Sequence, residues 1–142
     1  MKKTIFTLLL IAITSISVFS QEEEIKTNKE DKNLPDIFFK VKDHDFGTIQ
    51  YKEEAIYKFK FTNTGKEPLL LTNVRSSCGC TVPTWPKKPI KPGKKGEIAV
   101  KYNTRILNSF SKSIMVFSNA KTSQVRLTIK GKVVNQSKQS EQ

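Results

Sequence analysis

Two cysteines separated by a single glycine are the residues of this sequence best suited to chemistry. Cys78 and Cys80 are its only cysteines. In an extended strand their side chains would share one face, with Cα atoms about 6.6 Å apart. A disulfide requires Cβ atoms within about 4.5 Å, so closing the pair requires a bend at Gly79. Such a ring spans one intervening residue and would contribute little as a staple of the fold.

Three chemical roles are compatible with this pair. The first is a local disulfide, formed during export, that rigidifies a corner of the fold. The second is a soft-metal site, because two thiolates on one face could hold Cu(I), with Met115 as a candidate third sulfur. Zinc within one molecule is disfavoured because only His44 could join the cysteines, although two copies could share four thiolates. The third is thiol–disulfide exchange, for which the spacing is not the usual Cys-x-x-Cys.

Trp85, the only tryptophan of the chain, lies between Pro83 and Pro86 in a proline-rich loop that is rich in lysine. Its lysines are Lys87, Lys88, Lys91, Lys94 and Lys95. One interpretation is a binding loop for an anionic glycan or surface, with Trp85 as its apolar anchor. The other is that Trp85 folds back over the cysteine corner, since large aromatic side chains are usually mostly buried, and that the lysines are solvated.

His44 lies between Asp43 and Asp45, whose carboxylates favour the charged form of the imidazole. No second ligand accompanies it in the sequence, so we interpret it as structural. The sequence also lacks a nucleophile motif and a glycine-rich phosphate loop. We therefore predict that the protein is not an enzyme.

The elements that must position these residues are β-strands. Apolar and polar residues alternate with a period of two over residues 55–62, 98–102 and 125–133. More continuous apolar runs at 37–41, 69–74 and 110–117 fit strands at more buried positions. About seven short strands separated by turns predict an all-β fold, a single seven-stranded immunoglobulin-like sandwich. A small closed barrel is the alternative.

Glycines mark the bends between these strands. Gly47, after Phe46, would let the first strand bend where its backbone passes close to a neighbour. Gly65, in the turn that begins at Asn63, would adopt a positive φ. Pro92 and Gly93 suit the two central positions of a type II turn.

The two ends of the chain differ in character from the part between them. Residues 1–20 have the pattern of a signal peptide cleaved near Ser20 and Gln21, which predicts a periplasmic or otherwise extracytoplasmic protein without a membrane span in the mature chain. We predict a disordered acidic leader over 21–36, an immunoglobulin-like domain over 37–134 and a disordered tail over 135–142. The formal net charge is +12. In an exported protein this charge favours an anionic envelope surface or acidic protein as partner over nucleic acid.

The order of motifs in the domain resembles that of a known bacterial family. The motifs are "DFGTI" at 45–49, "YKFKFTNTGKEPLLLTNVRSSCGCT" at 57–81, "IKPGKKGEIAVKYN" at 90–103, "FSKSIMVFSN" at 110–119 and "LTIKGKV" at 127–133. They resemble the family catalogued as domain of unknown function 1573, and the most specific element is the segment from Ser77 to Thr81. The resemblance implies an exported immunoglobulin-like domain similar to the major sperm protein and centrosomal-ciliary sandwich domains. It implies no established activity.

Together these features predict a non-catalytic binding or scaffolding module of the bacterial cell envelope. Its expected partner is an envelope protein or peptide bound at a sheet edge, or an anionic envelope surface. The alternative is a copper-binding or thiol-redox periplasmic protein that uses Cys78 and Cys80.

Overall fold

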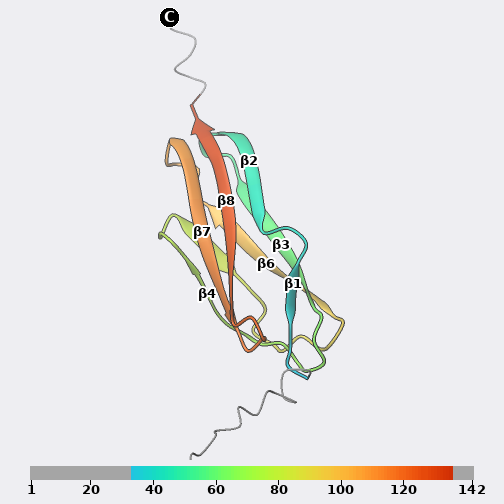
Figure 1. Ribbon diagram of the computed structural model, residues 1–142. Coiled ribbons are helices and arrows are strands. Elements are labelled where there is room, and N and C mark those ends of the chain that lie inside the picture. Colours follow the sequence, from blue (N-terminus) through green and yellow to red (C-terminus); the bar gives the residue numbers. More distant parts are fainter. Residues whose placement is uncertain (1–32, 136–142) are drawn as a thin grey trace, which may run out of the picture.

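Two four-stranded β-sheets face each other in the computed structural model, which describes residues 33–135 (Figure 1). The strands are β1 (Ile37–Phe39), β2 (Asp43–Gln50), β3 (Ala55–Asn63), β4 (Leu71–Ser76), β5 (Thr81–Thr84), β6 (Lys95–Tyr102), β7 (Asn108–Ser118) and β8 (Gln124–Val134). The first sheet has the order β1-β3-β6-β5 and the second the order β2-β8-β7-β4. Residues 33–135 contain no helix, and therefore none that could cross a membrane. The predicted signal peptide, most of the leader and residues 136–142 lie outside the described part.

The sandwich predicted from the sequence is confirmed, but it has eight strands rather than seven. One cause is that the chain changes sheets after Phe39. β1 pairs antiparallel with β3, whereas β2 pairs parallel with β8 in the other sheet. The other cause is β5, which lies in the stretch interpreted as a proline-rich loop. Pro83 fits there because β5 is an edge strand, where a missing N–H group breaks no ladder.

The alternating residues predicted to face inward do form the core. Phe59, Phe61, Ile98 and Val100 of the first sheet pack with the second sheet, and each is at most 2% exposed. The second sheet contributes Ile114, Val116, Leu127 and Ile129, which are equally buried. In both sheets every second side chain points inward, and the burial of these apolar side chains holds the two sheets face to face.

Two glycines have roles opposite to those expected from the sequence. Gly47 has a φ of 65° at a register shift between β2 and β8, and a Cβ atom there would meet nothing within 4 Å. It is therefore required for its backbone conformation and not for close packing. Gly65 has no positive φ, but a Cβ atom there would clash with the backbone of Leu34, Pro35 and Asp36. The ordered domain thus begins before Ile37.

The turn predicted at Pro92 and Gly93 is confirmed. Gly93 has a φ of 72°, and the amide of Lys94 donates to the carbonyl of Lys91 at 3.0 Å. These are the features of a turn with proline and glycine at its central positions.

The loops gather at two opposite ends of the sandwich (Figure 1). Residues 51–54, 77–80 and 103–107 form what we call the disulfide end, where backbone hydrogen bonds join Lys52 to Thr104 and Asn103 to Cys80. Residues 33–36, 64–70, 85–94 and 119–123 form the lysine end. There, backbone hydrogen bonds join Lys121 to Pro35 and Leu69 to Ile90.

Candidate functional site

The cysteines lie in the turn that carries the chain from one sheet to the other. Residues 77–80 link β4 of the second sheet to β5 of the first. Cys78 and Cys80 are joined by a disulfide with Cα atoms 5.3 Å apart, and the Thr81 amide donates to the Cys78 carbonyl at 3.4 Å. The bend predicted at Gly79 is therefore present. It requires no positive φ, and a Cβ atom at Gly79 would meet nothing within 4 Å.

Hydrogen bonds to both sheets hold this turn in place. The Ser76 hydroxyl lies 2.6 Å from the Cys78 carbonyl oxygen and 2.7 Å from that of Thr81. The Asn103 amide donates to the Cys80 carbonyl at 2.9 Å. On the β7 side, the Ser77 amide donates to the Ser113 carbonyl at 2.9 Å. The position of the turn thus rests on bonds other than the disulfide.

Thr81 is a site residue that the sequence analysis did not single out. Its side chain is 2% exposed, and its hydroxyl oxygen lies 3.9 Å from Sγ of Cys78 and 3.8 Å from Sγ of Cys80. A hydroxyl at these distances can interact with either sulfur. Its position directly after the second cysteine was the available signal.

A cavity of about 550 Å³ adjoins the disulfide. Gly79 and Cys80 form part of its wall, together with Lys52, Glu53, Glu54, Ala55, Val82, Lys101, Tyr102, Asn103, Thr104 and Arg105. Val82 is 58% exposed, and the neighbouring Ile106 and Leu107 are also exposed. The cavity is therefore bordered by apolar surface that is open to solvent.

Unusual backbone conformations occur at the same end. Lys52, in the cavity wall, has a φ of 66°, and Asn108, which follows Leu107, has a φ of 88°. Residues other than glycine rarely adopt such angles, and they often do so at functional sites.

Both signs of charge line the cavity, with a small excess of cations. Three basic side chains face two acidic ones, which gives the lining a formal charge of 3 − 2 = +1. Lys101 and Glu54 form an ion pair at 3.6 Å, and Glu53 accepts a hydrogen bond from the Gln50 amide at 2.7 Å. The Lys52 ammonium lies 5.2 Å from the centre of the Tyr51 ring. The ion pair cancels one charge of each sign and Glu53 keeps its negative charge, so the excess of one cation sets the sign of the field in the cavity.

His44 lies away from the cysteines, half-buried between the sheets. Its ring stacks on Tyr57 at 3.6 Å and meets the edge of Phe46 at 4.6 Å. Desolvation by this packing lowers the pKa of His44 below its ordinary value of 6.5, and the opposing effect of Asp45 is smaller. Asp45 does favour the charged form, as expected from the sequence, but burial outweighs it and the net effect favours the neutral imidazole.

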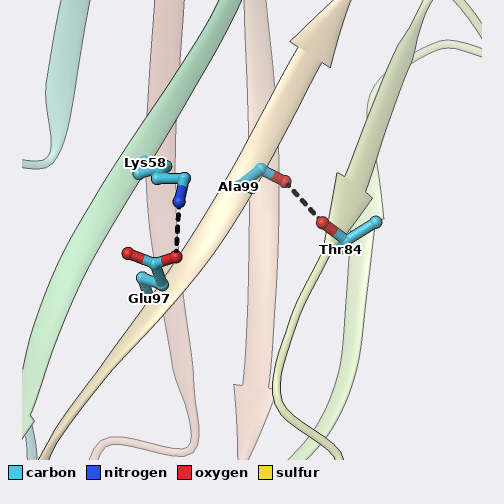
Figure 2. A network of polar contacts seen from close by, with 4 residues as sticks. All are labelled: Lys58, Thr84, Glu97 and Ala99. Carbon is cyan, nitrogen blue, oxygen red and sulfur yellow. Dashed lines mark hydrogen bonds and ion pairs between the residues drawn. The ribbon is translucent and has the colours of Figure 1, made fainter.

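Trp85 and the lysine loop lie at the other end of the molecule from the disulfide. Thr81 pairs with Tyr102 whereas Thr84 pairs with Ala99, so β5 places Trp85 about 13 Å along the strand from Thr81, the residue that follows Cys80. Figure 2 shows the hydroxyl of Thr84 donating to the Ala99 carbonyl at 3.5 Å, next to the ion pair of Lys58 and Glu97. Trp85 packs on the core there and does not cover the cysteine turn.

The five lysines of the loop are all exposed, as expected of solvated side chains. The Lys87 ammonium lies 3.1 Å from the centre of the Trp85 ring, a cation–π contact. Folding also brings Lys66 and Lys121 to this end. These two lysines lie far from the loop in the sequence, so only the fold groups them with it.

Comparison with known proteins agrees with the fold. A family model described as "Protein of unknown function (DUF1573)" matches residues 37–133, most of the chain. The chain belongs to the DUF1573 family. No curated protein matches it.

Solved structures share the sandwich of this DUF1573 domain at low sequence identity. A protein of unknown function from Porphyromonas gingivalis W83 has a TM-score of 0.65 and 17% identity, over 72% of this chain and 48% of that one. The PapD-like domain 7 of human CEP192 has a TM-score of 0.61 and 9% identity, over 72% of this chain and 87% of that one. The YadV chaperone has a TM-score of 0.53 and 14% identity, over 69% of this chain and 52% of that one. At such identities the likeness concerns the fold. This DUF1573 chain spans about half the length of the first of these structures.

A soft-metal site in this DUF1573 domain would require chemical reduction first. Both sulfurs are in a disulfide, which leaves no thiolate for Cu(I). Met115 alternates with the buried residues Ile114 and Val116 of β7 and so lies on the outer face of its sheet. Within residues 33–135, no three or more His, Cys, Asp and Glu side chains group as metal ligands. Copper binding stays a prediction for the reduced protein only.

Proposed function

We propose that this protein is an exported, non-catalytic binding module of the bacterial cell envelope, and that it binds a partner strand along the free edge of β4. The observation that supports this proposal is that β4 is the least protected edge of the two sheets. Each sheet has two edge strands, β1 and β5 in the first and β2 and β4 in the second. An unpaired edge offers a row of backbone donors and acceptors to an added strand.

The other three edges carry features that discourage strand addition. β1 has three residues. β5 has four and contains Pro83, which lacks an N–H donor. β2 is interrupted by the register shift at Gly47 and carries the charged residues Asp43 and Asp45. Short length, proline, bulges and charge are the usual means by which natural edges avoid pairing.

The β4 edge is regular over most of its length. A register shift near Thr72 is followed by unbroken pairing with β7 from Asn73 to Ser76, and Arg75 is its only charged residue. A hollow of about 240 Å³ lies beside it, lined by Thr72, Asn73, Arg75 and Phe117. The Arg75 guanidinium is 5.9 Å from the Phe117 ring. An added strand could therefore pair with β4 and place a side chain against this hollow.

Site-specific photocrosslinking tests the proposal. A benzoylphenylalanine in place of Thr72, on the β4 edge, is compared with one in place of Lys132, an exposed residue of the interior strand β8. With intact cells as the source of partners, we expect a discrete crosslinked envelope protein from the Thr72 position and none from the Lys132 position.

The cysteines provide the second arm of this experiment. Crosslinking from the Thr72 position should persist when Cys78→Ser and Cys80→Ser are combined, once circular dichroism shows that the variant folds. Equal crosslinking from both positions would argue against edge binding. Loss of the crosslink in the double variant would instead favour the cysteine-based alternative.

A further inference from the structure

We infer that the Cys78–Cys80 disulfide is a thiol-exchange site, at which an incoming thiolate attacks Sγ of Cys80 and Cys78 leaves as a thiolate. The inference does not depend on strand binding at β4. It concerns stoichiometric covalent capture of a thiol.

Access distinguishes the two sulfurs. Cys80 and Gly79 are part of the wall of the 550 Å³ cavity, whereas Cys78 is not among its lining residues. Both cysteines are only partly buried. A thiol that enters the cavity therefore reaches Cys80 first.

The environment stabilises the group that leaves. When Cys80 is attacked, the electron pair of the S–S bond goes to Sγ of Cys78, which lies 3.9 Å from the Thr81 hydroxyl. The same hydroxyl lies 3.8 Å from Sγ of Cys80, so it would stabilise either leaving thiolate, and access alone selects Cys80 as the sulfur that is attacked. A hydroxyl group that donates to a thiolate lowers the free energy of the charged form. Because Thr81 is 2% exposed, little water competes for that hydrogen bond.

The cavity also favours the nucleophile. Thiolate is the reactive form of a thiol, and positive charge nearby increases its fraction. Lys52 and Arg105 line the cavity as cations and Glu53 as an anion, while Lys101 is paired with Glu54, so the lining has a net formal charge of +1. An incoming thiol would thus ionise more readily in the cavity than in bulk water.

The fold tolerates opening of the disulfide. The ring contains one intervening residue, so opening it releases little chain entropy. Ser76, Asn103 and Ser113 hold the turn by hydrogen bonds that the exchange leaves intact. The site can therefore react without unfolding.

The step balances without an added oxidant or reductant. One S–S bond breaks and one forms, a thiolate is consumed and a thiolate is released, and the product is a mixed disulfide at Cys80. Attack by the Cys78 thiolate on that mixed disulfide reverses the reaction.

The thiol could belong to a low-molecular-mass compound or to a cysteine in a polypeptide. The exposed side chain of Val82 lines the cavity, and the exposed apolar residues Ile106 and Leu107 follow the lining residue Arg105 in the chain. They favour a cysteine flanked by apolar residues. The two sources are compared directly in the test.

The experiment treats the oxidised protein with glutathione or with a blocked leucine-cysteine-leucine peptide, and stops the reaction with N-ethylmaleimide. Mass spectrometry of proteolytic fragments then assigns each modification. We expect the thiol on Cys80 and the maleimide on Cys78, with faster reaction for the peptide. Thr81→Val should slow the reaction by about tenfold, the value of a hydrogen bond to a charged group, whereas Thr81→Ser should retain the rate.

Three results would overturn the inference. The first is a thiol adduct mainly on Cys78. The second is an unchanged rate in Thr81→Val, in a variant whose thermal melt matches that of the parent. The third is no adduct with either thiol under conditions in which the same chain, oxidised but unfolded in urea, reacts fully. The thiol adduct is assigned to Cys80 or Cys78 in the protein without substitutions. This part of the test therefore holds even if Thr81→Val fails to fold.

Discussion

Asn63, at the end of β3, organises the lysine end of the molecule. It is fully buried, and its amide nitrogen donates to the carbonyls of Glu67 at 2.8 Å and Ile90 at 2.9 Å. Its side-chain oxygen accepts from the Gly65 amide at 3.0 Å. One side chain thus joins the loop after β3 to the lysine loop.

Removing that side chain should be costly. Asn63→Ala leaves the Glu67 carbonyl and the Gly65 amide without this partner, whereas the Ile90 carbonyl keeps the bond that it accepts from the Leu69 amide. Because the lost side chain is fully buried, we expect the free energy of unfolding to fall by about 3 kcal/mol. Urea denaturation followed by tryptophan fluorescence measures the change. Asn119→Ala is the matched control, because exposed Asn119 makes similar bonds to Leu70 at 2.7 Å and Pro68 at 3.1 Å. Water can replace those bonds, so its loss should be below about 1 kcal/mol. Equal losses would show that burial does not determine the effect.

Sequence reasoning at the residue scale could find the residues but not their partners. Asn63 was recognisable as a turn former, yet its bond to Ile90 spans 27 positions and depends on how two loops fold together. Disulfide geometry required a bend at Gly79 only if the two cysteines were joined, and the sequence left that pairing open. The pKa of His44 could not be inferred, because its burial against Tyr57 is set by contact between the sheets.

At the scale of elements, the alternation of apolar and polar residues predicted most of the strands. It could not reveal β5, since four residues with a central proline lack a measurable period. Nor could it reveal that residues 37–50 divide between two sheets, because both halves have strand-like sequences. The sequence likewise cannot distinguish a glycine that is required by close packing, such as Gly65, from one that is required for a positive φ, such as Gly47.

Glycine substitutions separate these roles. We expect Gly65→Ala to destabilise the fold by about 1–3 kcal/mol, since its Cβ atom would clash with backbone atoms of Leu34 and Asp36 that have little room to move. Gly79→Ala, in the cysteine turn, should change stability by less than about 0.5 kcal/mol, because it has open space and no positive φ. Thermal unfolding of both variants and of the parent protein measures the two changes in stability. A large loss in Gly79→Ala would mean that the disulfide turn needs glycine for a reason other than space.

The whole molecule is electrically polarised along its long axis. The segments of the lysine end carry six lysines against two acids, whereas those of the disulfide end carry two basic and two acidic residues. Clustered cations add their potentials at one surface, so the orientation of the molecule near an anionic surface should be biased.

Charge reversal at the lysine end should weaken binding to anionic membranes more than reversal elsewhere. Each lysine near such a surface contributes about 1 kcal/mol. Combining Lys87→Glu, Lys88→Glu and Lys91→Glu should therefore lower affinity for phosphatidylglycerol vesicles by about 100-fold or more. The control combines Lys42→Glu, Lys60→Glu and Lys132→Glu. This variant has the same net charge as the first, but its substitutions lie outside the lysine end and far apart in the sequence. Vesicle sedimentation at low and high salt measures both, and similar affinities would show that only total charge matters.

The parallel pairing of β2 with β8 has a consequence for the order of folding. A chain is made from its N-terminus, and β2 finds its sheet neighbour only when residues 128–134, near the other end, have emerged. Until then β2 has no sheet partner, and β7 lacks the neighbour on one of its two sides. The second sheet is therefore completed only when β8 joins β2 to the pair of β7 and β4, a long-range step that is slow relative to the formation of local hairpins. A chain that stops before β8 would present an unpaired strand to any other polypeptide nearby.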